Sequence, residues 1–510
     1  MAVSRCVSTN ERWHLGDEVR TTYFNSRAWQ LVCASLALAG ILLSGCTKKE
    51  QVAAVDSDRD AEWGESVIEM ETYQKYKISG LDQPVIRQSD ILPLIEGLRQ
   101  APLLTVDQVG ESYQKRPLYS IALGKGTTRV MLWSQMHGDE PTATPALFDL
   151  LNYITAPEQA GWRDQWMDKL SLLIVPMLNP DGAERNSRHN AQSFDINRDA
   201  KALQSPEGRV LMQLAKDFKP QFGFNLHDQG SYYGVGDSGE AATISVLAPA
   251  FNVQRDINES RGNAMQLISV MVEKIQPAIG ANIGRYDDTY AWRAFGDTFS
   301  EMGISTILIE SGAHPNDPNR QVARHMNFEM LVTAIDSIAS GSYLSASRAT
   351  YDAIPLNEDD ALVDLKIRNV RAGQGDFTYR TDLAIRKRYG QTSVADVGDL
   401  SNLAGFLDYD ADGAWYQMPK AFLLDEEAPL ELTDERYLAL LREGVAYFEG
   451  DEALLVKETQ LPVVLNPQRL QGELPGRRRN ATFLLADANG VKAAILDGEL
   501  IEVREFQRAN

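Results

Sequence analysis

Apolar and polar residues follow two different rhythms between about residue 85 and residue 340. Short apolar runs bounded by glycine or polar residues indicate strands, and longer segments with apolar residues every three or four positions indicate helices. The short runs predict strands at residues 117–124, 129–136, 170–178, 222–227 and 304–312. The longer periods predict helices at residues 91–101, 144–154, 206–218, 259–276 and 327–341.

This alternation of strands and helices predicts an α/β fold. Strands separated by helices pair in parallel, because each helix carries the chain back across the sheet. Runs that are apolar throughout predict strands covered on both faces. We therefore expect a three-layer α/β/α sandwich with a mixed, mainly parallel sheet, and we place this domain at residues 76–345.

The pattern changes after about residue 355, where strand signals follow one another with few helical periods between them. Turn sequences, DADG at residues 410–413 and DANG at residues 487–490, punctuate this part of the chain. The strand signals lie at residues 362–370, 376–387, 481–487 and 491–503. They predict a smaller, β-rich C-terminal domain over residues 356–510.

An apolar stretch at residues 28–45 follows two arginines and ends in small residues, which is typical of a signal peptide. Its last residues and Cys46, LSGC, resemble the bacterial lipobox, so residues 1–46 are expected to be a signal peptide with Cys46 lipidated. An uncleaved anchor helix is the alternative. The polar segment 47–75 is expected to be a tether.

The lipobox resemblance also implies where in the cell the protein is located. A lipid on Cys46 would hold the chain to a membrane of the bacterial cell envelope, on its periplasmic face. Thr47 after the cysteine favours the outer membrane. The net charge of −21 argues against nucleic acid as a partner, because binding phosphates needs a basic face.

The positions of the three cysteines exclude several kinds of site in the mature chain. Cys6 and Cys33 lie in the predicted signal peptide, so the mature chain would keep only Cys46. A single cysteine forms no disulfide within the chain. A lipidated cysteine also supplies neither a nucleophile nor a thiolate ligand for zinc.

Metal-ligating residue types stand at the ends of two predicted strands. His137 and Glu140 follow the strand at 129–136, and His227 ends the strand at 222–227. The carboxyl ends of parallel strands meet at one edge of a sheet, where functional groups collect. Two histidines, a carboxylate and a water are a ligand set of catalytic zinc. We therefore predict one Zn²⁺ per chain, although each residue alone fits a buried histidine or a capping glutamate.

A third strand end supplies a candidate base. Glu310 directly follows the apolar run TILI, where a carboxylate is costly without a function or a partner. Hydrolysis at zinc needs a group that accepts the proton of water and passes it to the leaving group. Between the histidines, residues 178–200 are rich in Arg, Asn and Asp. This segment fits a solvated loop, or a site for a substrate carboxylate.

The ordered motifs over roughly residues 75–340 resemble the zinc metallocarboxypeptidases of the carboxypeptidase A-like fold, which include bacterial murein-peptide members. The motifs are HGDE at residues 137–140, NPDG at 179–182, RHNAQSFDINRD at 188–199, SPE at 205–207 and NLH at 225–227. This resemblance implies a hydrolase that removes the C-terminal amino acid from peptides, with a peptide or murein peptide as its substrate.

The resemblance also implies a role for each site residue. His137, Glu140 and His227 would bind zinc, and Glu310 would be the general base. Arg188 would hold the oxyanion of the scissile carbonyl. Asn197 and Arg198 would bind the terminal carboxylate of the substrate, and Asp195 would orient His137. A tyrosine would cap the bound substrate, and for this role we favour Tyr290 over Tyr286.

Several positions depart from the family pattern or leave the substrate open. Asp199 follows the Asn–Arg pair where the family often has another asparagine, and Asp139 stands between the first two ligands where the pancreatic enzymes have arginine. Arg285 and Arg293 lie where a pocket for the substrate's last side chain could form, which would suit an acidic residue.

Two other functions fit parts of the sequence. An N-acyl amino acid deacylase of the aspartoacylase and succinylglutamate desuccinylase type shares the zinc motif and an Asn–Arg pair. A non-catalytic lipoprotein that binds peptide or glycan would be expected to lose ligands or the base. Here all four of these positions, at residues 137, 140, 227 and 310, are filled.

Overall fold

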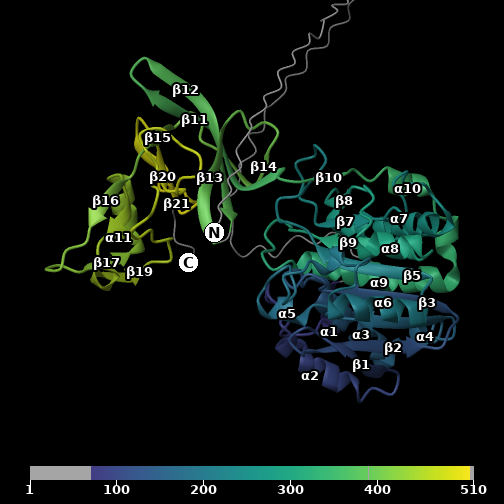
Figure 1. Ribbon diagram of the computed structural model, residues 1–510. Helices are drawn as coiled ribbons and strands as arrows, with labels where there is room; N and C mark the ends of the chain where they lie inside the picture. The colour runs from purple at the N-terminus through teal and green to yellow at the C-terminus, as the bar shows by residue number, and fades with distance from the viewer. Residues whose placement is uncertain (1–69, 389, 506–510) are drawn as a thin grey trace, which may run out of the picture. The chain divides into compact units, whose positions relative to one another are not determined.

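A computed structural model describes residues 70–388 and 390–505 (Figure 1). The predicted signal peptide, the lipidation site at Cys46 and most of the predicted tether lie outside the described residues. The end of the tether range falls within helix α1 (Met70–Tyr76), where Tyr73 is buried in the core. No helix in the described part of the chain has the length and apolar character needed to cross a lipid bilayer.

The first domain is built on an eight-stranded sheet with the order β1-β2-β4-β3-β5-β9-β7-β8. Its strands are β1 (Thr105–Glu111), β2 (Pro117–Gly124), β3 (Thr128–Ser134), β4 (Leu170–Val175), β5 (Phe222–Asp228), β7 (Ile244–Leu247), β8 (Ile283–Arg285) and β9 (Ser305–Ser311). The central strands β4, β3, β5 and β9 run parallel, whereas β1, β2 and β7 form antiparallel pairs. The sheet is therefore mixed, as predicted.

Helices cover both faces of this sheet, which confirms the three-layer α/β/α architecture. They are α2 (Gln88–Leu98), α3 (Ala143–Thr155), α6 (Pro206–Phe218), α7 (Glu259–Ile279), α8 (Phe295–Glu301) and α9 (Gln321–Ser340), with the short α4 (Ala160–Arg163), α5 (Pro180–Glu184) and α10 (Arg348–Asp352). Successive residues of β3 point to opposite faces. Leu132 packs in the core that α3, α7 and α9 cover, and Trp133 packs in the core under α6 and α8.

The ends of several elements differ from the sequence prediction. Helix α9 begins at Gln321, before the predicted start at residue 327, because the buried polar side chains of Arg324 and His325 hide its apolar period. Strand β4 ends at Val175, since Pro176 has no backbone N–H for the ladder. Ser205 caps α6 as expected, with its hydroxyl accepting a hydrogen bond from the backbone N–H of Gly208.

The C-terminal part of the chain is rich in β structure, as predicted. Its larger sheet has the order β13-β12-β11-β15-β20-β21-β22, with β14 paired to β11. These strands are β11 (Leu362–Gln374), β12 (Phe377–Arg388), β13 (Gln391–Gly398), β14 (Ala404–Asp410), β15 (Trp415–Gln417), β20 (Phe483–Asp487), β21 (Gly490–Leu496) and β22 (Glu499–Ile501). Helix α11 (Asp434–Arg442), which was not predicted from the sequence, packs near two small sheets. One pairs β16 (Lys420–Leu423) with β18 (Val445–Glu449), and the other pairs β17 (Leu430–Thr433) with β19 (Leu455–Glu458).

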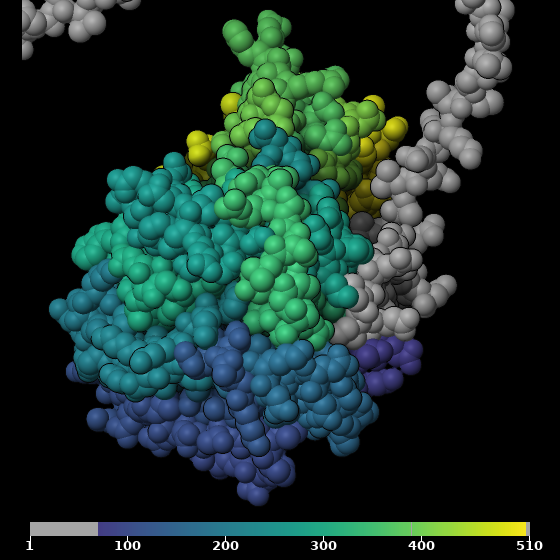
Figure 2. All heavy atoms as spheres, turned by 90° about the vertical axis from the view of Figure 1, so that its right-hand side faces the viewer, coloured from purple at the N-terminus to yellow at the C-terminus, as the bar shows by residue number. Residues whose placement is uncertain are grey.

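Figure 2 shows the first domain from another side. Purple and blue residues, from the beginning of this domain, gather at its lower end, and teal residues from the middle of the chain lie above them. This agrees with the strand order, in which β1 and β2 form one edge of the sheet and β7 and β8 form the other. The central strands between these edges carry the candidate site.

Candidate active site

Three neighbouring parallel strands bring the predicted chemistry to one edge of the sheet. His137 lies in the turn after β3, His227 lies in β5 and Glu310 lies in β9. Since β5 pairs with both β3 and β9, these residues meet at adjacent strand ends, and His227 is directly opposite Glu310 in the ladder. The expectation that strand ends would collect these side chains is therefore met.

His137, Glu140 and His227 form the one group of potential metal ligands found among the described residues. One ligand atom from each lies within 4.8 Å of the others. His137 Nδ1 is 2.8 Å from Glu140 Oε1, and His227 Nδ1 is 2.7 Å from Glu140 Oε2. All three side chains are buried or nearly so. Two imidazole nitrogens and one carboxylate oxygen, converging in this way, fit a tetrahedral zinc ion.

Asp195 and Arg188 surround this ligand group. Asp195 Oδ1 lies 3.0 Å from Nε2 of His137, on the side of the ring opposite Glu140. A carboxylate in this place fixes the orientation of a metal-binding imidazole. Arg188 donates hydrogen bonds to Glu140 and to Asp195, at 2.9 and 3.1 Å. The structure thus places Asp195 against His137 and Arg188 against both carboxylates.

Burial and neighbouring charges shift the pKa values of the ligand group in opposite directions. Burial disfavours protonation of both histidines. At His137 the Glu140 carboxylate and Asp195 outweigh that effect and raise the pKa, whereas at His227 burial prevails and lowers the pKa. The two histidines in turn hold the pKa of Glu140 well below its usual value, against the effect of burial. The carboxylate is thus ionised, as a metal ligand must be.

Glu310 lines the same cavity as the ligand group. Burial raises its pKa well above the usual value for glutamate, and the charges of Glu140 and Asp228 raise it further. The guanidiniums of Arg188 and Arg320 act in the opposite direction. A raised pKa suits a carboxylate that accepts and then donates a proton near neutral pH.

The cavity that holds these groups has a volume of about 440 Å³. Asn197 and Arg198 line it, beside the ligand group. The Asn197 amide nitrogen is 3.4 Å from Nε2 of His227, and its oxygen accepts a hydrogen bond from the backbone N–H of Phe295. Arg198 is exposed and forms no ion pair within the described residues. Its guanidinium is therefore available to an anionic ligand.

The tyrosine that we favoured is not among the residues that line the cavity. The Tyr290 hydroxyl donates a hydrogen bond to Glu301 of α8 instead. Tyr286, the other candidate, lines the cavity, and its hydroxyl lies 3.4 Å from that of Tyr233, a second lining residue. The geometry thus favours Tyr286 over Tyr290, a choice that the sequence spacing alone did not allow.

The arginines expected near the substrate's last side chain point elsewhere. Arg285 lies over the ring of Tyr351 and 3.8 Å from Asp352, and Arg293 is exposed, with neither lining the cavity. Sequence reasoning missed Asn225 and Asp297, which do line it. An uncharged polar residue inside the apolar run FGFNLH was the available signal for Asn225.

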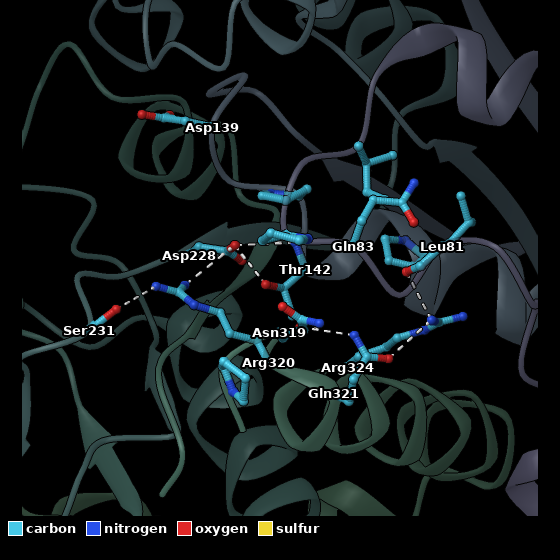
Figure 3. A pocket seen from close by; sticks show the side chains of 15 residues that line it. Leu81, Gln83, Asp139, Thr142, Asp228, Ser231, Asn319, Arg320, Gln321 and Arg324 are labelled. Atoms are coloured by element: carbon cyan, nitrogen blue, oxygen red, sulfur yellow. Dashed lines mark hydrogen bonds and ion pairs between the residues drawn. The ribbon is translucent and has the colours of Figure 1, made fainter. Parts of the chain in front are cut away.

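A smaller, polar cavity of about 230 Å³ adjoins the site, with Asp228 in the walls of both (Figure 3). One Asp228 oxygen accepts hydrogen bonds from Thr142, and Arg320 lies 3.4 Å away. Figure 3 shows the Arg320 side chain directed toward Asp228 and Ser231. Asp139 also lines this cavity, so this departure from the family pattern lies beside the ligand group and outside it.

Comparisons with known proteins agree with this geometry. Residues 94–238 match the family model described as "Zinc carboxypeptidase". The chain is 31% identical over 100 residues to "Probable carboxypeptidase 2" of Arthroderma benhamiae, which is 20% of this chain and 19% of that protein. It therefore spans about a fifth of the length of the curated relatives it matches.

Solved structures with a similar chain path include two bacterial proteins. One is a putative carboxypeptidase A from Shewanella denitrificans, with a TM-score of 0.42, 15% identity, and coverage of 51% of this chain and 70% of that chain. The other is a metallo-carboxypeptidase from Pseudomonas aeruginosa, with a TM-score of 0.41, 16% identity, and coverage of 50% and 70%.

The family match and the geometry concern the same residues. The matched range contains the three predicted ligand residues and the Asn–Arg pair, which line one cavity, and it contains Asp195, which contacts His137. Residues 94–238 of this chain thus form a region that matches the zinc carboxypeptidase family.

Proposed function

We propose that this protein is a zinc-dependent carboxypeptidase, which removes the last amino acid from a peptide. One observation carries the proposal. A His–Glu–His ligand group, a half-buried glutamate and an arginine without an ion-pair partner among the described residues line one cavity. Hydrolysis of a terminal peptide bond needs these three elements, which are a Lewis acid site, a proton acceptor and a carboxylate binder.

The residues divide the reaction between them. A zinc ion held by His137, Glu140 and His227 would supply the Lewis acid that makes water a nucleophile at neutral pH. Glu310 would accept the proton of the attacking water and pass it to the leaving amine. Arg188, held beside the ligand group by Glu140 and Asp195, would donate hydrogen bonds to the oxyanion.

The substrate would be oriented by its free terminal carboxylate. Arg198 would bind this group with Asn197, because a guanidinium presents a planar fork that matches a carboxylate. Tyr286, which lines the cavity, is the better placed of the two tyrosines to close over the bound residue. Each of these contacts selects substrates with an unblocked C-terminus.

The predicted lipid anchor suggests where the enzyme works. Lipidation at Cys46 would place it on the periplasmic face of the cell envelope, in the outer membrane, where murein peptides are available. The choice of a murein peptide as the peptide substrate is inferred from this predicted location alone. Labelling with a radioactive or clickable fatty acid, compared with the Cys46→Ser variant, tests the anchor directly.

The activity can be tested with a pool of N-blocked dipeptides. We expect mass spectrometry to detect release of the C-terminal amino acid, and chelator treatment to abolish it. Glu310→Gln should lower kcat by about 10²–10⁴-fold, because it removes the proton acceptor, while zinc stays bound at one per chain. Release from N-acyl amino acids but from no dipeptide would contradict the carboxypeptidase proposal and favour a deacylase.

A further inference from the structure

Besides the ligand group, the cavity is lined by a set of small or apolar residues and by polar side chains that include Asn225, Asp288 and Asp297. The apolar and small residues are Leu247, Pro249, Ala250, Ala291, Ala294, Gly296 and Leu308. A region lined in this way accepts a side chain of the substrate and reads its polar end.

Asp297 is a buried carboxylate that forms no ion pair among the described residues, although the charge of Arg198 acts on it. It lies in the first turn of α8, its side chain is largely covered, and Oδ1 accepts a hydrogen bond from the backbone N–H of Ala291 at 2.8 Å. Burial raises its pKa to about 6. Asp288, in the same cavity wall, instead forms ion pairs with Arg261 and Arg255 at 2.7 and 3.1 Å.

Asn225 adds a second unsatisfied acceptor. It lies in β5 and is 1% exposed, and its side-chain oxygen has no hydrogen-bond donor within the described part of the chain. A buried amide oxygen without a donor costs free energy, so such an oxygen in a cavity wall points to a ligand. Gly296 leaves this wall open, since a Cβ there would lie 3.3 Å from Pro249 and 3.6 Å from the Asn225 amide nitrogen.

We propose that this region binds the side chain of the substrate's last residue and prefers lysine or arginine, with Asp297 as the ion-pair partner and Asn225 as a second acceptor. An ammonium or guanidinium carries only donors, whereas the Asp297 carboxylate and the Asn225 side-chain oxygen are acceptors, and the Asn225 oxygen has no donor among the described residues. Its stem would lie against the apolar wall. The inference rests on the proposed function, and it replaces the acidic preference suggested by Arg285 and Arg293.

The test compares N-blocked dipeptides that end in Lys, Arg, Leu or Glu. We expect kcat/KM for the basic pair to exceed that for Leu by at least about tenfold, and Glu to be the poorest substrate. Asp297→Asn should lower the ratio of Lys to Leu by at least about tenfold, mainly through KM. Asp217→Asn, at an exposed carboxylate of α6 outside the cavity wall, should leave this ratio unchanged.

Binding to Glu310→Gln gives a readout that does not depend on turnover. Calorimetry should show tighter binding of the Lys and Arg peptides than of the Leu peptide. Turnover of Leu or Glu peptides at least as fast as basic ones would overturn the inference and leave the carboxypeptidase proposal standing. Failure to cleave or bind any dipeptide would overturn both. The unmodified chain alone decides these outcomes, so they hold even if Asp297→Asn does not fold.

Discussion

Asp195 shows how one side chain can control a ligand without being one. Its two oxygens are divided between Nε2 of His137 and the guanidinium of Arg188. The histidine is thereby held with Nδ1 toward Glu140, and the arginine is held beside the same carboxylate. Of the predicted roles, that of Asp195 concerns orientation and not bond breaking, so its loss should affect metal affinity first.

Asp195→Asn is expected to weaken zinc binding by about 10–100-fold, since the amide lacks the charge that orients His137 and pairs with Arg188. Competition with a chromogenic chelator measures the affinity. Asp217→Asn, at an exposed carboxylate of α6, is the matched control and should change nothing. An unchanged zinc affinity in Asp195→Asn would show that His137 keeps its orientation without the Asp195 carboxylate.

Asp297 should make stability depend on pH. Its folded-state pKa of about 6 exceeds the value of about 3.9 for an unfolded chain, so the native carboxyl keeps its proton to higher pH. Stability contributed by this group is thus present at low pH and is lost as pH rises through about 6. The size of the effect is on the order of 2 kcal/mol.

Urea unfolding of the unmodified chain and Asp297→Asn, from pH 4 to pH 7, tests this. Relative to the unmodified chain, the variant should gain free energy of unfolding as pH rises, because the amide has no proton to lose. A difference between the two that stays constant with pH would contradict the raised pKa. Asp288→Asn should show no such gain, because the pKa of Asp288 is lowered by its arginines.

At the scale of elements, one buried ion pair joins helices that are distant in sequence. Asp149 of α3 is fully buried and binds Arg324 of α9 through both oxygens, at 2.8 and 2.7 Å. The hydroxyl of Tyr73 in α1 donates to the same carboxylate, as does the backbone N–H of Ile78. This network therefore fixes α1 and α9 against α3, whose N-terminal end follows the HGDE turn.

Asp149→Asn is expected to lower the free energy of unfolding by about 3–5 kcal/mol, because it removes the buried carboxylate that pairs with the Arg324 guanidinium. Asp82→Asn supplies the control. Asp82 contacts the same arginine at 3.2 Å but is half exposed, so its loss should cost less than about 1 kcal/mol. Equal effects of the two substitutions in chemical denaturation would contradict the assignment of the ion pair.

For the whole molecule, periodicity was sufficient to predict the sheet with its covering helices, because strands buried on both faces leave long apolar runs. It failed where polar residues are buried, as at Arg324 in α9, or where a strand is very short, as in β7 and β8. For the site, the residues within recognisable motifs could be predicted from the sequence. The places of Asp297 and Tyr286 in the cavity wall could not, because they depend on how the segment between β8 and α8 folds.

The position of Glu310 has a practical consequence for making the enzyme. The similarity to the family ends at residue 238, yet β9, with Glu310, pairs with β5 and with β7 beyond that boundary. The family match also begins at residue 94, which lies after α1 and within α2. A fragment cloned to the limits of the family match would contain the three predicted metal ligands but would lack Glu310, the proposed proton acceptor. Expression boundaries should therefore be drawn from the sheet, starting before Met70 and ending after Ser340.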